Sequence, residues 1–154
     1  MIHRASAMPP GRWDWPVASA ERYHGDKVEG FVWRPAPDLF VTRVIGHADL
    51  GAVRFYVTRA QSAILAGHKI AVFHDWSQIT TYDRQARDRL RSFAAQNDEA
   101  FRGVYYLVAS KIIMMAISAA AVALGRSLYA YTDPGEFHAK LEEALATSFR
   151  APAL

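Results

Sequence analysis

Side chains able to bind a partner or accept a phosphoryl group are concentrated between residues 75 and 91. An apolar run that begins at Ile70 ends at Asp75, and three hydroxyl side chains follow it: Ser77, Thr80 and Thr81. A second acid then precedes three arginines spaced three and four residues apart: Asp83, Arg84, Arg87 and Arg91. Polar residues between a buried strand and a helix lie where open α/β sheets commonly bind ligands. All eight are therefore candidate partner-binding residues, and Ser77, Thr80 and Thr81 are possible phospho-acceptors.

The same stretch also has a purely structural interpretation. Serine, threonine and aspartate are the usual helix caps, so residues 75–83 are expected to form a polar turn in which Thr80 or Asp83 caps the next helix. Asp83 can pair with Arg87 four residues later, and the arginines can form an ordinary solvated face. A docking role and a capping role do not exclude each other.

The histidines and hydroxyls do not form a catalytic or metal-binding pattern. His74 and Asp75 are adjacent, but neighbouring side chains on a strand point to opposite faces, so only one of them can enter a given site. The remaining histidines are scattered without ligand spacing, the chain has no cysteine, and no GxSxG motif is present. The sequence predicts no catalytic residue, no metal and no cofactor.

A second candidate surface is the predicted helix over residues 110–124. Ser110 is a good N-cap and Gly125 a good C-terminal stop, and between residues 112 and 124 only Ser118 is polar. One face can pack on a sheet, but the opposite face is apolar too, which favours a homodimer contact, a protein partner, an apolar ligand or lipid, or cover by Trp13 and Trp15. The candidate interface residues are Ile112, Ile113, Met114, Met115, Ile117 and Val122. The alternative is a helix buried between the sheet and a neighbouring helix.

Composition indicates one globular domain. The 154 residues are 51% hydrophobic and 21% charged, and the net charge of +3 does not single out nucleic acid as a partner. No secretory signal is evident at the start, and no apolar run is long enough to span a bilayer. We expect a soluble, cytoplasmic protein with no membrane span.

Hydrophobic periodicity and turn residues predict an α/β fold. After an arm or tail at residues 1–26, strands are expected at 28–33 and 39–45, a helix at 49–67, a strand at 70–75 and a helix from 83 to about 97. A strand at 103–109, the helix from 110, a strand at 128–131 and a helix opened by Asp133 and Pro134 follow. The order β-β-α-β-α-β-α-β-α implies one mixed sheet of about five strands with four helices. The domain is assigned to residues 27–150 and a short tail to residues 151–154.

The stretch AVFHDWSQITTYDRQARDRL resembles the STAS domain, and in particular SpoIIAA-like single-domain proteins related to bacterial anti-anti-sigma factors. Asp75 matches the family's strand-end acid, and Asp83 matches the acid before its switch serine. Arg84 stands at the serine position, and the glycine-rich segment after it is replaced by ARD, so the family's phosphorylation cannot occur there. The resemblance covers roughly residues 28–148.

The resemblance implies a non-enzymatic regulatory or protein-interaction module that is divergent at the switch serine. Its implied partner is a protein, such as an anti-sigma-like regulator, and the helix over residues 110–124 adds a suspected homodimer contact. The alternative is a small apolar-ligand or lipid-binding protein with a pocket beside that helix. SpoIIAA-like proteins resemble, more distantly, lipid-transfer domains of the CRAL-TRIO type, which supports this alternative.

Overall fold

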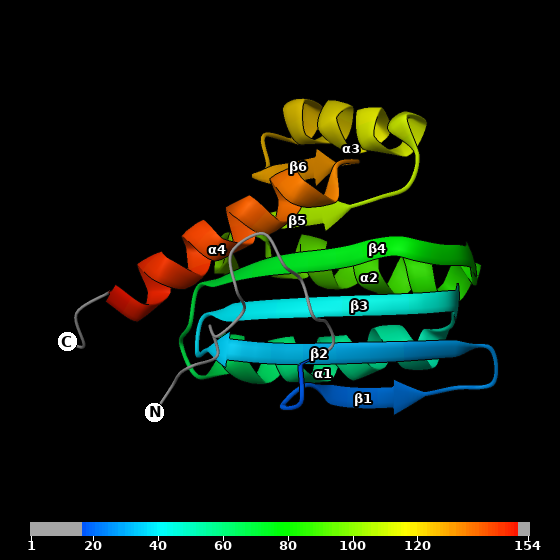
Figure 1. The fold of residues 1–154 in the computed structure, drawn as a ribbon, viewed down its shortest axis with the longest axis horizontal. Coiled ribbons are helices and arrows are strands. Elements are labelled where there is room, and N and C mark those ends of the chain that lie inside the picture. Colours follow the sequence, from blue (N-terminus) through cyan, green and yellow to red (C-terminus); the bar gives the residue numbers. More distant parts are fainter. Residues whose placement is uncertain (1–16, 151–154) are drawn as a thin grey trace.

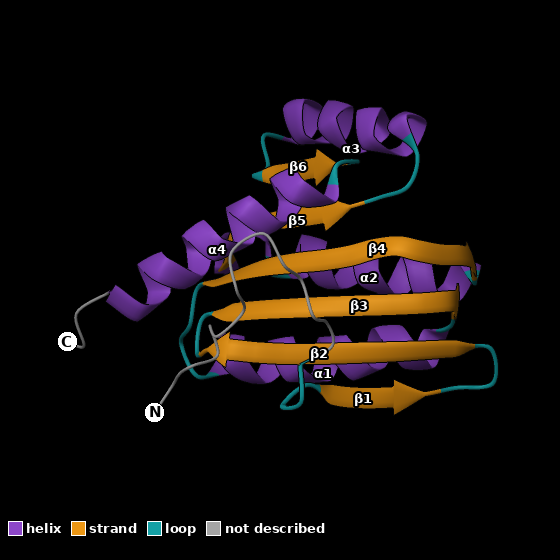
Figure 2. Ribbon diagram, viewed as in Figure 1, coloured by secondary structure: helices purple, strands orange, loops and turns teal. Residues whose placement is uncertain are grey.

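The computed structural model describes residues 17–150, with side chains as far as residue 148. They form one six-stranded sheet and four α-helices (Figures 1 and 2). The strands are β1 Glu21–His24, β2 Val28–Ala36, β3 Leu39–Ala48, β4 Ile70–Tyr82, β5 Phe101–Leu107 and β6 Leu128–Tyr131. The helices are α1 Leu50–Leu65, α2 Arg84–Gln96, α3 Lys111–Leu124 and α4 Pro134–Arg150, with a 3-10 turn, η2, at Asp98–Ala100.

The spatial order of the strands is the same as their order along the chain. β1, β2 and β3 are antiparallel neighbours, and β3, β4, β5 and β6 are parallel, joined by helical crossovers. Helices α1 and α2 cover one face of the sheet, and α4 crosses the other (Figure 1). The predicted mixed α/β fold with four helices is confirmed.

The sheet has one strand more than expected. β1 lies within residues 1–26, which we assigned to an N-terminal arm, and it pairs with β2 through Glu21 opposite Val32. Three of its four residues are exposed, so this edge strand lacks the apolar alternation that marks a half-buried strand. Trp13 and Trp15 lie outside the described residues.

The predicted helix ends are confirmed by their capping contacts. Asp49 Oδ1 accepts a hydrogen bond from the Ala52 amide at 2.8 Å, and Ser110 accepts from the second and third residues of α3. Gly125 ends α3 in the left-handed conformation, at φ 64°. At the start of α4, Asp133 Oδ1 accepts from the Gly135 amide at 3.0 Å.

The prediction of a turn over residues 75–83 is wrong, because β4 continues to Tyr82. β5 ends opposite Asp75, but β4 goes on pairing with β3, placing Gln78 opposite Ile45 and Thr81 opposite His47. The β-branched residues of this stretch suit a strand as well as a turn, and the ten-residue β3 supplies the partner. The part of β4 beyond β5, Trp76–Tyr82, is called the β4 overhang below.

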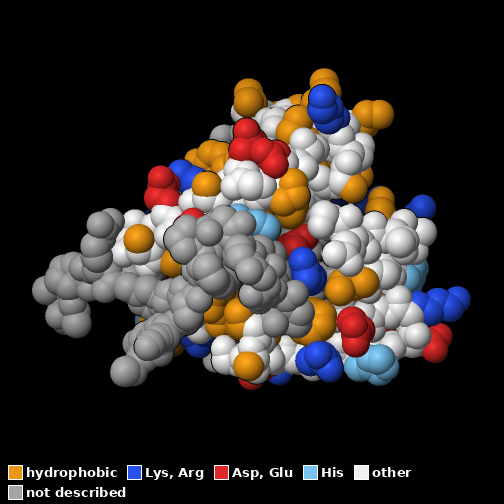
Figure 3. Space-filling model, viewed as in Figure 1, with side chains coloured by type: hydrophobic (Ala, Val, Ile, Leu, Met, Phe, Trp, Pro, Cys, Tyr) orange, Lys and Arg blue, Asp and Glu red, His pale blue; other side chains and the backbone are white. Residues whose placement is uncertain are grey.

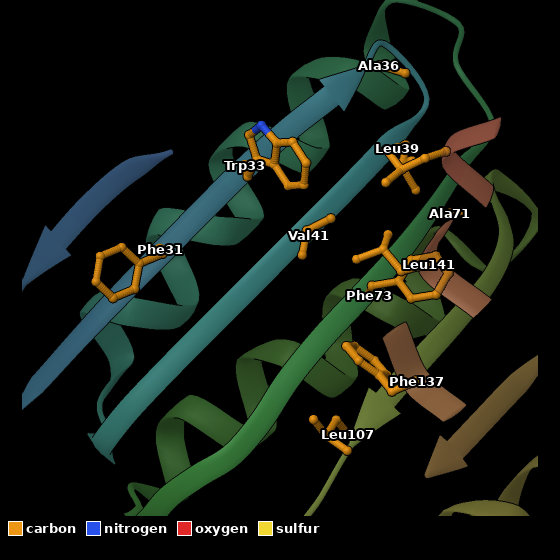
Figure 4. Packing of buried hydrophobic residues seen from close by; sticks show 11 residues of the cluster. Phe31, Trp33, Ala36, Leu39, Val41, Ala71, Phe73, Leu107, Phe137 and Leu141 are labelled. Atoms are coloured by element: carbon orange, nitrogen blue, oxygen red, sulfur yellow. The ribbon is translucent and has the colours of Figure 1, made fainter. Parts of the chain in front are cut away.

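The core has two layers, one on each side of the sheet. On the α4 side, Phe73 of β4 meets Phe137 of α4 edge to face, with ring centroids 5.7 Å apart, and Leu141 packs beside them (Figure 4). On the α1 and α2 side, Tyr56 and Phe93 lie over the middle strands. Phe137, Leu141 and Leu145 are all buried, so one apolar stripe of α4 belongs to this layer of the core.

Candidate functional site

Asp75 is a buried anchor where β4 separates from β5. Its side chain is 2% exposed, and Arg43 of β3 binds Oδ2 through Nε at 3.1 Å and through Nη2 at 3.0 Å. Ser77 donates to Oδ1 from its amide at 3.2 Å and from its hydroxyl at 2.7 Å. Because four donors converge on a buried carboxylate, Asp75 and Ser77 stabilise the start of the β4 overhang from inside. The prediction that Asp75 itself contacts a partner is not supported by this geometry.

The parallel register of β3 and β4 places Arg43 opposite Asp75. Sequence reasoning missed Arg43 because it precedes Asp75 by 32 residues and stands alone in a strand. An arginine among alternating apolar residues of a strand was the signal that a charged partner was needed.

His138 of α4 lies in the electrostatic field of this pair. Burial lowers the pKa of His138, the nearby carboxylate of Asp75 opposes that shift, Arg43 adds to it, and Asp133 opposes it. The charges of this pair therefore influence the protonation of His138.

On the opposite face, His74 is enclosed by aromatic rings. Its Nδ1 lies 2.7 Å from Thr42 Oγ1, its ring stacks on Trp76 at 4.6 Å and Tyr106 at 5.3 Å, and Tyr56 meets it edge-on. Burial lowers the pKa of His74 to about 3 and raises that of Tyr106 to about 12. The expected divergence of His74 and Asp75 is confirmed, and a neutral, enclosed His74 is a packing residue.

The lowered pKa predicts a pH dependence of stability. Below its ordinary pKa of 6.5, His74 takes up a proton in the unfolded chain but not in the folded protein until about pH 3. Its contribution to stability is therefore complete above pH 6.5 and is lost as the pH falls towards 3. Between pH 6.5 and about 5.5 this loss should be about 1 kcal/mol.

Urea unfolding at a series of pH values would measure this effect. His74→Asn should flatten the pH slope, whereas His24→Gln, at a side chain that is 76% exposed, should leave it unchanged. An identical slope in wild type and His74→Asn would contradict the assignment.

Thr81 and Asp83 belong to a second cluster, at the far end of β4. His47 of β3 bridges them, with Nδ1 at 2.7 Å from Thr81 Oγ1 and Nε2 at 2.7 Å from Asp83 Oδ1. The predicted pairing of Asp83 with Arg87 is wrong, because His47 holds Asp83 and the Nε of Arg87 lies 3.5 Å from Asp88 instead. Asp83 is the N-cap residue of α2 but makes no side-chain capping bond.

The remaining predicted residues lie on the surface. Thr80, Arg84 and Arg91 are exposed and Arg87 is half-buried, so these four follow the β4 overhang into α2. The predicted set therefore separates into an internal anchor, a histidine-linked pair and an exposed strip. Thr81 and Asp83 are exposed as well, so a partner can reach them and the exposed strip but not Asp75.

α3 is the most exposed apolar element that the structure describes. None of its residues is buried; Ile112 is 79% exposed, Met115 65% and Val122 85%. Met114 and Ile117 are half-buried, Ile113 is 51% exposed, and the neighbouring element of α3 is β6. The alternative of a helix buried within the domain is wrong, and apolar side chains gather at this end of the molecule (Figure 3).

A cavity of about 120 Å³ lies beside the C-terminal end of α3. It is lined by Ala94, Asp98, Phe101, Val104 and residues 125–128. No group of three histidine or acidic residues within 17–150 is placed to hold a metal ion. None of the helices in that range is long and apolar enough to cross a membrane.

The fold is the part of this geometry that known structures share. An uncharacterised protein of the DUF3478 family from Shewanella loihica PV-4, described as having a SpoIIAA-like fold, superposes with a TM-score of 0.58. The match covers 77% of this chain and 97% of that protein, at 13% sequence identity. The fold is SpoIIAA-like. The resemblance read from residues 71–90 is thereby confirmed at the level of fold.

Comparison of the sequence with known families and proteins gives no match. No protein-family model matches the chain, and no curated protein is significantly similar to it. The role of the SpoIIAA-like domain therefore has to be argued from its own surfaces.

Proposed function

We propose that this SpoIIAA-like domain is a non-enzymatic interaction module that docks a protein partner at the β4 overhang and the start of α2. The β4 overhang is the observation behind this proposal: it extends past β5 and ends in exposed residues, with Tyr82 55% exposed. The buried pair of Asp75 and Arg43 holds it from within. A rigid, exposed strip is pre-organised for binding, because little entropy is lost when a partner docks on it.

Docking on this surface does not need the family's phosphoserine. Arg84 occupies the position that resembles the switch serine, and the hydroxyls of Ser77 and Thr81 are engaged by Asp75 and His47. Thr80 is exposed, and neither Asp75 nor His47 binds its hydroxyl. We therefore propose constitutive docking, with Thr80 as the remaining acceptor for a kinase.

Binding to purified anti-sigma-like regulators from the source genome tests the docking surface. Tyr82→Ala combined with Arg84→Glu should weaken binding at least tenfold, because tyrosine and arginine are the side chains that most often carry binding energy and both are exposed at the tip. The control is Arg54→Glu, which makes the same charge change at an exposed position on α1. Equal binding by both variants would contradict docking at the β4 overhang.

We also propose that α3 is a self-association surface. Ile112, Met115 and Val122 contribute nothing to the core, so their exposure is an apolar patch of the kind that marks an interface. Ala116, Ala119 and Ala123 follow at spacings of three and four and allow a second helix to approach closely.

Light scattering of the full chain is expected to give a dimer. Ile112→Glu with Val122→Glu should give a folded monomer with the circular dichroism spectrum of the wild type, because neither residue is buried within the domain. Its melting temperature should no longer depend on protein concentration. Leu65→Glu, at a residue of α1 that is 78% exposed, should remain dimeric. A wild-type protein that stays monomeric at high concentration would remove the proposal.

The cavity beside α3 supports a second candidate, the binding of a small apolar ligand or lipid. Phe101, Val104 and Leu128 form the apolar part of a mixed lining, and about 120 Å³ is well below the roughly 300–1,000 Å³ of common ligand sites. Mass spectrometry of the organic extract of purified protein would reveal a retained ligand. A clean extract would favour the interaction module.

A further inference from the structure

β4 extends past the end of β5, and one edge of its last residues has no partner strand (Figure 1). β5 pairs with β4 from Ile70 to Asp75, whereas β3 pairs with it as far as Tyr82. Within residues 17–150, no strand, loop or side chain bonds to the backbone of residues 78–82 on the β5 side. We call this side of residues 78–82 the open edge; all of them except Ile79 are exposed.

The backbone of Tyr82 points away from β3, towards the open edge. In a β-strand the N–H and C=O groups of one residue point to the same side, and those of the next residue point to the opposite side. The Asp83 amide donates to the Ala48 carbonyl of β3 at 3.0 Å, so the amide of Tyr82 faces the β5 side instead. Tyr82 therefore offers both a donor and an acceptor to an added strand.

The side chains of the β4 overhang do not guard its edge against another strand. Edge strands of natural proteins are usually protected by short length, charge or proline. The outer strands of this sheet, β1 and β6, have four residues each, and β1 carries Glu21, Arg22 and His24. The β4 overhang, WSQITTY, contains no charge and no proline. Its tryptophan, isoleucine, threonine and tyrosine side chains all favour strand structure.

We infer that the open edge takes an extended segment of the protein partner as an added β-strand. Unpaired N–H and C=O groups along a strand edge complement another strand, whereas a helix has already satisfied its own backbone groups. Main-chain hydrogen bonds supply the affinity in this mode of binding, and alternate side chains of the added segment supply the specificity. A stretch of five residues matches a strand of ordinary length.

A second copy of the chain is a less suitable occupant of the open edge. Two open edges paired with each other would join only five residues from each copy, whereas a specific interface has roughly 20–30 residues on each side. A protein partner can add contacts to the exposed Arg84 at the start of α2. Strand addition thus rests on the proposed docking at the β4 overhang and specifies the backbone contacts that the partner makes.

Two synthetic peptides test strand addition on the full chain. Both have about eight residues in which threonine alternates with valine, and in one of them every backbone amide is methylated. The unmethylated peptide should bind at least tenfold more tightly, because methylation removes the donors of the added strand and leaves its side chains unchanged. In a nitrogen-15 NMR titration with this peptide, the amide of Tyr82 should exchange with solvent at least tenfold more slowly.

Tyr82→Pro removes the donor that faces the open edge and leaves the Asp83 amide free to bond to β3. Proline is tolerated in an edge strand where the N–H faces solvent, and circular dichroism would confirm the fold. Tyr82→Pro should bind the unmethylated peptide at least tenfold more weakly than Tyr82→Ala, which loses the same side chain but keeps the amide. Equal binding by these two variants, or equal binding of the two peptides to the wild type, would overturn the inference.

A natural partner separates strand addition from docking itself. A partner that is lost in the Tyr82→Ala, Arg84→Glu variant but binds Tyr82→Pro as well as Tyr82→Ala would leave the proposed function intact and refute strand addition. Protection of the Tyr82 amide that rises with the concentration of the free protein would identify a second copy as the occupant, which also contradicts the inference.

Discussion

Asp75→Ala is expected to lower the free energy of unfolding by about 3–5 kcal/mol, among the largest effects of any single substitution in this domain. The substitution leaves Arg43, whose side chain is only 15% exposed, without its carboxylate in a poorly hydrated setting. It also removes the carboxylate oxygen that accepts hydrogen bonds from the amide and the hydroxyl of Ser77. Urea unfolding followed by circular dichroism would measure the change.

Two controls separate the buried pair from a general charge effect. Asp83→Asn removes an acid that is 49% exposed and should cost about 1 kcal/mol or less. The double substitution Arg43→Met with Asp75→Leu should recover much of the loss, because it removes both charges rather than isolating one. A single Asp75→Ala as stable as Asp83→Asn would show that the pair does not hold the β4 overhang.

Gly46→Ala should destabilise the protein by about 2–5 kcal/mol, from backbone strain together with a steric clash. Gly46 has φ 97° and lies at a shift in the register between β3 and β4. A Cβ there would come within 2.4 Å of the carbonyl oxygen of Lys27, a backbone atom that cannot rotate away. The same carbonyl accepts the His47 amide at 2.9 Å, so any adjustment also disturbs the strand beside the histidine cluster.

Gly67→Ala is a matched control for this substitution. Gly67 has nearly the same φ, 95°, but nothing lies within 4 Å of its Cβ position. Gly67→Ala should therefore lower the free energy of unfolding only by the conformational strain, about 1–2 kcal/mol. The difference between the melting temperatures of the two variants measures the cost of the steric clash with Lys27. Equal melting temperatures would mean that the backbone at Gly46 relaxes to avoid it.

Local signals were sufficient to predict the helices. Capping by Asp49, Ser110 and Asp133 and the stop at Gly125 depend on residues within one turn of each other. For the same reason, the apolar stripe of α4 could be read directly from spacing.

The length of β4 and its long-range partners could not be read in this way. Serine and threonine between residues 77 and 81 suit a turn and a strand equally, and the choice was made by β3, a partner about thirty residues earlier. Arg43 and His47 were missed for the same reason, since only strand pairing brings them to Asp75 and Thr81. The sequence could therefore propose a candidate segment, but it could not separate the internal residues of that segment from the external ones.

The strand order has a consequence for how the protein is made. Every strand pairs with the strand before it in the chain, so no strand has to wait for a distant segment to supply its neighbour. During synthesis the sheet can grow from one edge as each strand leaves the ribosome, with β1 first and β6 last. Until α4 follows, the α4 side of β4, including Phe73, has no helix of its own to cover it. Closure of this face is therefore the final step, and it depends on the last seventeen-residue helix of the domain.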